Sequence, residues 1–303
     1  MRAPVQAMNS SIPAVSAVVQ STTSGAAFLS MAEGSLNEEE VSNNTILSIA
    51  KQAGFQGSLL RPPFWFGLAR STSGRFGAAV HALPDGAVLT DMDSELCEDL
   101  MSTLVHEGIT PKRIYGPPLV AQIAANTVSS LSEQSFCPQR YWVAYTTSSP
   151  VVQPSTAPGN LRLASNEDSS IVRDFGDQYS EEKTSLVAAS DYFLHKLSQR
   201  DLYLWTDPTP GNVKTLIALS GRTENVVRIA GVFTPQKYRG HGYASAAIRE
   251  VTNRELGQGY QSVTLMVEYT DDDAIHIYEK LGFRHHGSSV EMILERPIDR
   301  KTD

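Results

Sequence analysis

The segment from Val226 to Leu256 constrains the fold more than any other part of the chain. It begins with VVRIAGVF, an almost continuous apolar run typical of a buried central strand. The turn TPQKYRGHGY follows, and from Ala244 onward the apolar residues recur at the spacing of one helix face. We therefore predict a strand, a glycine-bearing turn and an amphipathic helix in direct succession.

This turn predicts a site for a phosphate or pyrophosphate group. Backbone N–H groups at the start of a helix have no partner within it and lie at the positive end of the helix dipole. Gly240 and Gly242 carry no Cβ, so a ligand can approach their backbone closely. The glycines alone leave open a plain strand–turn–helix in which they serve packing.

Two other phosphate-binding folds fit the sequence poorly. A Walker-type loop is excluded because the chain contains no Gly-Lys-Ser/Thr. A dinucleotide-binding fold needs its glycine fingerprint near the start of a long series of parallel strands, and only about 60 residues follow this turn.

Helices and strands alternate along the rest of the chain, which predicts an α/β fold with a mixed sheet. In the first half we expect a helix that includes residues 46–50 and stops at Gly54, strands at 64–68, 78–82, 87–89, 113–116 and 141–145, and helices at 94–107 and 119–131. In the second half we expect strands at 161–164, 203–205, 214–219, 226–233 and 263–267, and helices at 166–179, 181–199, 244–256 and 271–281.

Composition and charge exclude several classes of protein. The 303 residues have a net charge of −8, and residues 1–150 and 151–303 contribute −4 each, so neither half has the basic surface of a nucleic-acid-binding module. Two cysteines are too few for a disulfide scaffold. No run of about 18 apolar residues occurs, so we expect no membrane partner and a cytoplasmic protein.

The ends of the predicted domains follow from changes in composition. Residues 1–32 contain one basic and no acidic side chain but eight Ser or Thr, which favours a disordered head over an organellar targeting peptide without excluding the latter. Residues 146–160, TTSSPVVQPSTAPGN, are typical of a linker. We therefore expect a disordered head at 1–25, a first domain at 26–145, a linker at 146–160 and a second domain at 161–303.

The turn after the central strand resembles motif A of the GNAT superfamily of N-acetyltransferases, Gln/Arg-x-x-Gly-x-Gly/Ala. Arg239, Gly242 and Ala244 fill its three fixed positions, and YEKLGF at 278–283 resembles motif B. The first half has no such turn. The resemblance implies two tandem GNAT-like domains, of which the first is degenerate and the second holds the acyl-CoA site; glycine N-acyltransferase-like proteins are similar in this respect.

The resemblance also implies a reaction. Acetyl-CoA would be the co-substrate, and a primary amine, either a small amine or an amino acid, would attack it directly. No metal and no nucleic-acid partner are expected, and the oligomeric state is not predicted. A protein lysine acetyltransferase and a non-catalytic acyl-CoA-binding sensor or scaffold are the alternatives.

Site residues follow from the motifs. Tyr278 matches the tyrosine that protonates the departing thiolate, and Glu268, at the end of the neighbouring strand, is our first candidate for the general base, ahead of Glu181, Glu182 and Tyr269. That strand is expected to separate from the central one and admit the acyl chain. The residues expected to bind the co-substrate are Val232, Phe233, Thr234, Arg239, Gly240, His241, Gly242, Tyr243, Ala244 and Asp271.

Asp271 and His276 each have an ordinary structural explanation. Asp271 stands where many family members have Asn, and a helix cap is favoured over contact with a cationic amine. His276 is two residues before Tyr278 and so faces another side of its helix, where we expect it to be exposed.

Overall fold

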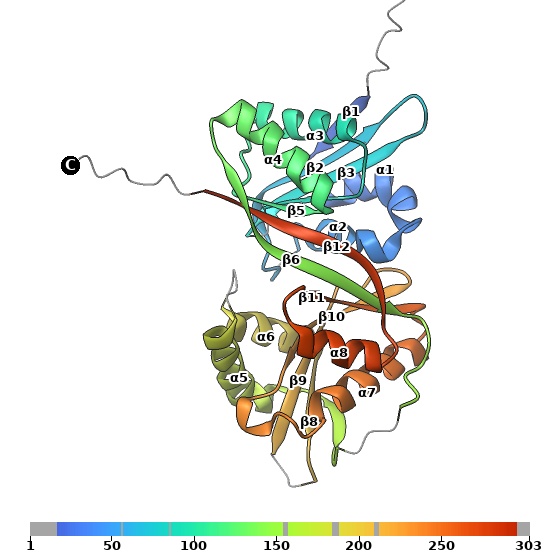
Figure 1. Cartoon of the computed structure of the whole chain (residues 1–303), viewed down its shortest axis with the longest axis vertical. Helices are drawn as coiled ribbons and strands as arrows, with labels where there is room; N and C mark the ends of the chain where they lie inside the picture. Colours follow the sequence, from blue (N-terminus) through green and yellow to red (C-terminus); the bar gives the residue numbers. More distant parts are fainter. Residues whose placement is uncertain are drawn as a thin grey trace, which may run out of the picture.

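The computed structural model describes residues 17–55, 57–84, 86–153, 157–183, 188–208 and 212–295. Across these residues twelve strands form one sheet in the order β1-β2-β3-β4-β5-β12-β6-β11-β10-β9-β8-β7, with helices on both faces (Figure 1). Parallel and antiparallel pairs both occur. The α/β fold with a mixed sheet is therefore confirmed.

The first half follows the predicted pattern with one correction. Its elements are β1 (Val18–Thr22), α1 (Gly25–Asn37), α2 (Glu40–Gln52), β2 (Arg61–Arg70), β3 (Phe76–Leu83), β4 (Gly86–Leu89), α3 (Ser94–His106), β5 (Arg113–Gly116), α4 (Pro118–Ser132) and β6 (Phe136–Thr147). Residues 1–16 of the predicted disordered head lie outside the described residues, but 18–22 form a strand. Backbone pairing with β2 and the contact of Val19 with the core order this segment despite its polar composition.

The second half contains β7 (Asn160–Leu163), a 3-10 turn (Asn166–Asp168), α5 (Ser169–Glu182), α6 (Ala189–Ser198), β8 (Leu202–Thr206), β9 (Val213–Ser220), β10 (Val226–Phe233), a second 3-10 turn (Gln236–Tyr238), α7 (Tyr243–Gly257), β11 (Ser262–Glu268), α8 (Asp272–Lys280) and β12 (Arg284–Leu294). The helix expected at 181–199 is wrong at its start. Residues 181 and 182 end α5, because the chain becomes extended only at Lys183.

The two halves exchange their last strands. β6, from the first half, pairs with β11, whereas β12, from the second half, pairs with β5; β6 and β12 also pair with each other. Val143 and Tyr145 of β6 therefore lie in the core beneath α7 and α8, and Val290 and Met292 of β12 lie in the core beneath α3 and α4. Each half thus lacks part of its core without the other.

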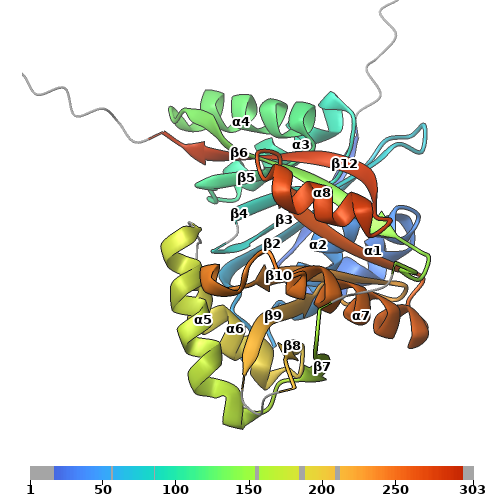
Figure 2. The same ribbon diagram turned by 60° about the horizontal axis from the view of Figure 1, so that its bottom comes forward.

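Helices α3, α4, α7 and α8 cover one face of the sheet, and α1, α2, α5 and α6 cover the other (Figure 2). Two residues that pair across neighbouring strands lie on the same face of the sheet, and successive pairs along β6, β11 and β12 alternate between the two faces. Glu268, Arg140 and Glu291 lie on the face that carries α1, α2, α5 and α6, because Glu268 pairs with Trp142 and Glu291 with Arg140.

Candidate functional site

The site begins where two parallel strands separate. β10 and β11 pair only from Val226 with Ser262 to Ile229 with Leu265, although both strands continue to Phe233 and Glu268. A bulge between Ile229 and Gly231 bends β10 against β9. The separation expected from the family resemblance is therefore confirmed, and it leaves the end of β10 unpaired on the side of β11.

The glycine turn lies directly beyond this strand end. Gly240 and Gly242 have φ values of 76° and 77°, a conformation that glycine adopts without strain, and Gly242 is the N-cap of α7. No side chain caps this helix. Among hydrogen bonds between described residues, the amides of 240–242 have no acceptor. These amides at the start of a helix are compatible with a bound phosphate group, which stays a prediction.

One residue of the turn departs from the expectation. The amide of Arg239 donates to the carbonyl of Gln236 at 3.2 Å, so it is already satisfied and does not point to a ligand. The Arg239 side chain instead donates through Nε to the carbonyl of Thr234 at 2.9 Å and pairs with Glu182 of α5. His241 contacts the Arg239 carbonyl through Nδ1 at 2.7 Å and stacks on the Tyr243 ring.

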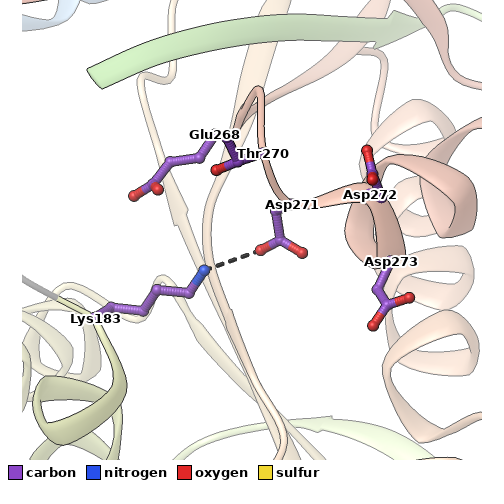
Figure 3. Close-up of a pocket in the computed structure, with 6 residues that line it drawn as sticks. All are labelled: Lys183, Glu268, Thr270, Asp271, Asp272 and Asp273. Atoms are coloured by element: carbon purple, nitrogen blue, oxygen red, sulfur yellow. Dashed lines mark hydrogen bonds and ion pairs between the residues drawn. The ribbon is translucent and has the colours of Figure 1, made fainter. Parts of the chain in front are cut away.

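A cleft of about 410 Å³ lies beside the separated strands, lined by Lys183, Glu268, Thr270, Asp271, Asp272 and Asp273. Glu268 and Lys183 extend into the same space, whereas Asp272 and Asp273 lie on the first turn of α8 (Figure 3). Lys183 Nζ is 2.9 Å from Asp271 Oδ2, and Asp271 Oδ1 accepts from the amide of Ala274 at 3.3 Å. Asp271 is therefore a helix cap, as favoured.

Tyr278 is a buried residue of α8, the helix whose first turn borders this cleft. Its side chain is 9% exposed and its ring packs edge-on against Phe283. Burial, followed by the charges of Asp271 and Tyr179, raises the pKa of the Tyr278 hydroxyl well above its usual value. The hydroxyl therefore keeps its proton at neutral and moderately alkaline pH.

Sequence analysis missed two residues of the site. Tyr179 of α5 packs against Phe233 at a ring distance of 5.7 Å, and burial raises its pKa. Its helical spacing from Phe175 was a usable signal for an inward-facing side chain. Arg140 of β6 has Nη1 3.7 Å from Glu268 Oε1. No local pattern pointed to Arg140, because strand exchange brings it to the second half.

The other candidates for the general base are less well placed than Glu268. Glu181 and Tyr269 are exposed, and Glu182 is paired with Arg239. His276 is exposed on α8, as expected. In the described part of the chain, no group of three or more His, Cys, Asp or Glu side chains has the geometry of a metal site.

The start of α3 in the first half carries carboxylates, whereas the start of α7 in the second half carries the glycine turn. Asp93 is the N-cap of α3 and Glu95 lies in its first turn, and Arg75 pairs with both. Negative charge at a helix N-terminus repels a phosphate. The start of α3 thus differs from the start of α7, where a glycine is the N-cap.

Residues 169–283 match the sequence model of the family described as Acetyltransferase (GNAT) family. This segment is a GNAT domain. N-acetylaspartate synthetase from Homo sapiens is 32% identical over 91 residues, which is 30% of this chain and 30% of that protein. The protein of the same name from Xenopus tropicalis is 31% identical over 99 residues, or 32% of this chain and 36% of that protein. The match thus spans about a third of these relatives' length.

Solved GNAT structures share the fold of nearly the whole chain. A tandem GNAT protein from the clavulanic acid biosynthesis pathway covers 93% of this chain and 100% of its own, with a TM-score of 0.51 and 15% identity. A GCN5-related N-acetyltransferase from Sphaerobacter thermophilus covers 93% and 96%, with a TM-score of 0.56 and 13% identity. The chain therefore has the fold of two tandem GNAT-like domains, and acyl transfer to an amine is the chemistry that its family match supports. Among the described residues, no helix has the length and apolarity needed to span a bilayer.

Proposed function

We propose that this protein is an N-acetyltransferase that transfers the acetyl group of acetyl-CoA to the primary amine of a small amine or amino acid. The observation that carries the proposal is the separation of β10 from β11, with an uncapped glycine turn beyond the end of β10 and a cleft that Glu268 lines at the end of β11. The glycine N-acyltransferase-like organisation of the chain and the amino acid in the name of its relatives support the acceptor class.

The glycine turn would hold the pyrophosphate of the co-substrate. The amides from Gly240 to Ala244, at the start of α7, would donate to it. The unpaired end of β10, from Val232 to Thr234, would contact the pantetheine arm, and the amide of Val232 or Phe233 would polarise the thioester carbonyl. Acetyl-CoA supplies the activated acyl group.

Two side chains would move protons. Glu268 faces the cleft and would accept a proton from the acceptor ammonium, directly or through water. Tyr278 retains its hydroxyl proton because burial raises its pKa, and it would donate that proton to the departing thiolate. No acyl-enzyme is needed, and Cys97 is unsuited to form one because burial raises the pKa of its thiol to about 12.

The test is release of free thiol from acetyl-CoA in the presence of amines, amino acids and lysine peptides, together with calorimetry of CoA binding. Gly242→Asp adds a carboxylate to the phosphate turn and should weaken CoA binding about 100-fold. Gly34→Asp, at an exposed position of α1, is the matched control. Unchanged CoA affinity in Gly242→Asp contradicts the site. CoA binding without thiol release for any acceptor favours the sensor, and release with lysine peptides alone favours a protein acetyltransferase.

A further inference from the structure

The cleft already holds a primary ammonium, and it belongs to the protein itself. Lys183 and Asp271 both line the cleft, and Lys183 Nζ lies 2.9 Å from Asp271 Oδ2. The Lys183 side chain extends from the end of α5 toward Asp271, in the space that Glu268 also enters (Figure 3). A lysine of the chain thus occupies a place in which the proposed reaction needs the ammonium of an acceptor.

Asp271 has a separate oxygen for this ammonium. Its Oδ1 accepts from the amide of Ala274 at 3.3 Å and caps α8, whereas Oδ2 contacts Lys183. The cap therefore does not depend on Lys183. With Glu268 lining the same cleft, two carboxylates are complementary to an amine that binds in its protonated form and then loses a proton.

Lys183 is charged but not firmly held. Burial opposes its charged form, but the hydrogen bond to Asp271 and the charges of Asp271 and Glu268 outweigh burial and raise the pKa of Lys183. The Lys183 side chain is 40% exposed and that of Asp271 is 32% exposed, so water screens the pair. Because an ion pair of this kind contributes little free energy, a ligand of the same charge can displace the lysine.

We propose that Asp271 Oδ2 binds the ammonium of the acceptor and that Lys183 is an internal competitor for this place. The acceptor displaces Lys183 from Asp271, and its own ammonium then faces Asp271 and the candidate base Glu268. Lys183 therefore lowers the apparent affinity for the acceptor, because only molecules with a displaced lysine can bind it. This inference rests on the proposed function, because it locates the acceptor of the same reaction.

Kinetics of the full-length protein with the best amine of the thiol-release panel test this competition. Lys183→Met should lower KM for the acceptor about three- to fivefold and leave kcat within about twofold, because it removes an exposed ion pair. Lys51→Met is the matched control: Lys51 is similarly exposed and pairs with Glu33 outside the cleft, so KM should not change. Lys183→Arg keeps the charge and its partner, so KM should stay near the wild-type value.

Chemical labelling separates displacement of Lys183 from a change in the charge of the cleft. CoA replaces acetyl-CoA so that no transfer occurs, and a trace of deuterated acetic anhydride labels the lysines of the wild-type protein. Peptide mass spectrometry reports the labelling of Lys183 relative to that of Lys51. A saturating concentration of the acceptor should raise this ratio about threefold, because an ammonium released from Asp271 loses its proton more readily.

The outcomes distinguish this inference from the function on which it rests. An unchanged KM in Lys183→Met, or an equal fall of KM in Lys51→Met or Lys183→Arg, overturns the inference. A labelling ratio that the acceptor leaves unchanged or lowers overturns it as well. Absence of thiol release with every amine overturns the proposed function instead.

Discussion

Tyr278 owes its chemical character to its neighbours. An exposed tyrosine has a pKa near 10, and burial among the side chains beneath α8 raises that value here. Because the ionised form is disfavoured, the hydroxyl stays protonated at neutral and moderately alkaline pH. The same burial makes a merely structural role the competing explanation, and kinetics can distinguish the two.

Tyr278→Phe should lower kcat about 100-fold while leaving CoA affinity unchanged, because only the proton donor is removed. Steady-state kinetics and calorimetry measure the two quantities. Tyr141→Phe, a half-exposed tyrosine on β6, serves as the control. Equal turnover in Tyr278→Phe and the wild-type protein would exclude the hydroxyl from the reaction.

Lys196 of α6 is a second residue whose surroundings set its ionisation. It is 4% exposed, and burial lowers its pKa from 10.5 to about 8; the charges of Arg228 and Arg222 act in the same direction and Asp201 opposes them. The unfolded chain therefore binds more protons than the folded one between about pH 8 and 10.5, so stability rises with pH through this window.

Lys196→Met should raise the free energy of unfolding at pH 7, by up to about 3 kcal/mol, because it removes a buried charge. The gain should shrink at pH 9.5, where the folded-state lysine is already neutral. Chemical denaturation at both pH values measures this, with the exposed Lys112→Met as control. A gain that is the same at both pH values would show that packing, and not charge, is responsible.

At the scale of elements, the C-terminus of α5 connects the two motifs of the GNAT domain. Glu182 pairs with Arg239 in the glycine turn, and the next residue, Lys183, pairs with Asp271 at the start of α8. The end of one helix thus contacts both the phosphate-type turn and the cap beside the cleft. Neither pair is buried, so each contributes little to stability on its own.

Removing the carboxylate of Glu182 should favour an anionic ligand at the turn. We expect Glu182→Gln to tighten CoA binding by about two- to fivefold at low salt, because Arg239 loses a competing partner, and the gain should diminish at high salt. Calorimetry at two ionic strengths measures it. Glu181→Gln changes the net charge equally without breaking the pair, and an equal effect in both variants would contradict the role of the contact.

At the scale of the whole molecule, strand exchange makes the two halves interdependent. β6 covers the edge of β11, and β12 lies between β5 and β6. A separated half would expose an unpaired strand edge and lose core side chains such as Tyr145 or Met292. An independent second domain bounded at 161 would lack β6, so we now propose that the halves fold together.

Division of the chain at Val152, which is 85% exposed, tests this interdependence. Residues 1–152 and 153–303 produced together should copurify as a one-to-one complex that binds CoA, whereas either piece alone should aggregate. Size-exclusion chromatography with light scattering measures the outcome. A monomeric, folded 153–303 fragment that binds CoA at full affinity would show that the exchanged strand is dispensable.

Much of this protein follows from local sequence. Apolar periodicity predicted most of the strands and helices, because an element with one buried face must repeat its apolar residues at the period of its geometry. The glycines at 240 and 242 predicted the turn, because their positive φ values are a local backbone requirement. The polar segment at 18–22 was missed, since pairing with β2 and not its composition makes it a strand.

The tertiary structure decided which half completes which site. Strand exchange depends on contacts between residues more than a hundred positions apart, such as Arg140 with Glu268, and no periodicity within one segment encodes them. The same holds for the pKa of Tyr278, which follows from burial, and for the engagement of Arg239 by Glu182. Sequence alone determined the elements and the motif, because these are short-range properties of the backbone. Only packing determined the neighbours of each functional group, because charge and desolvation act through space.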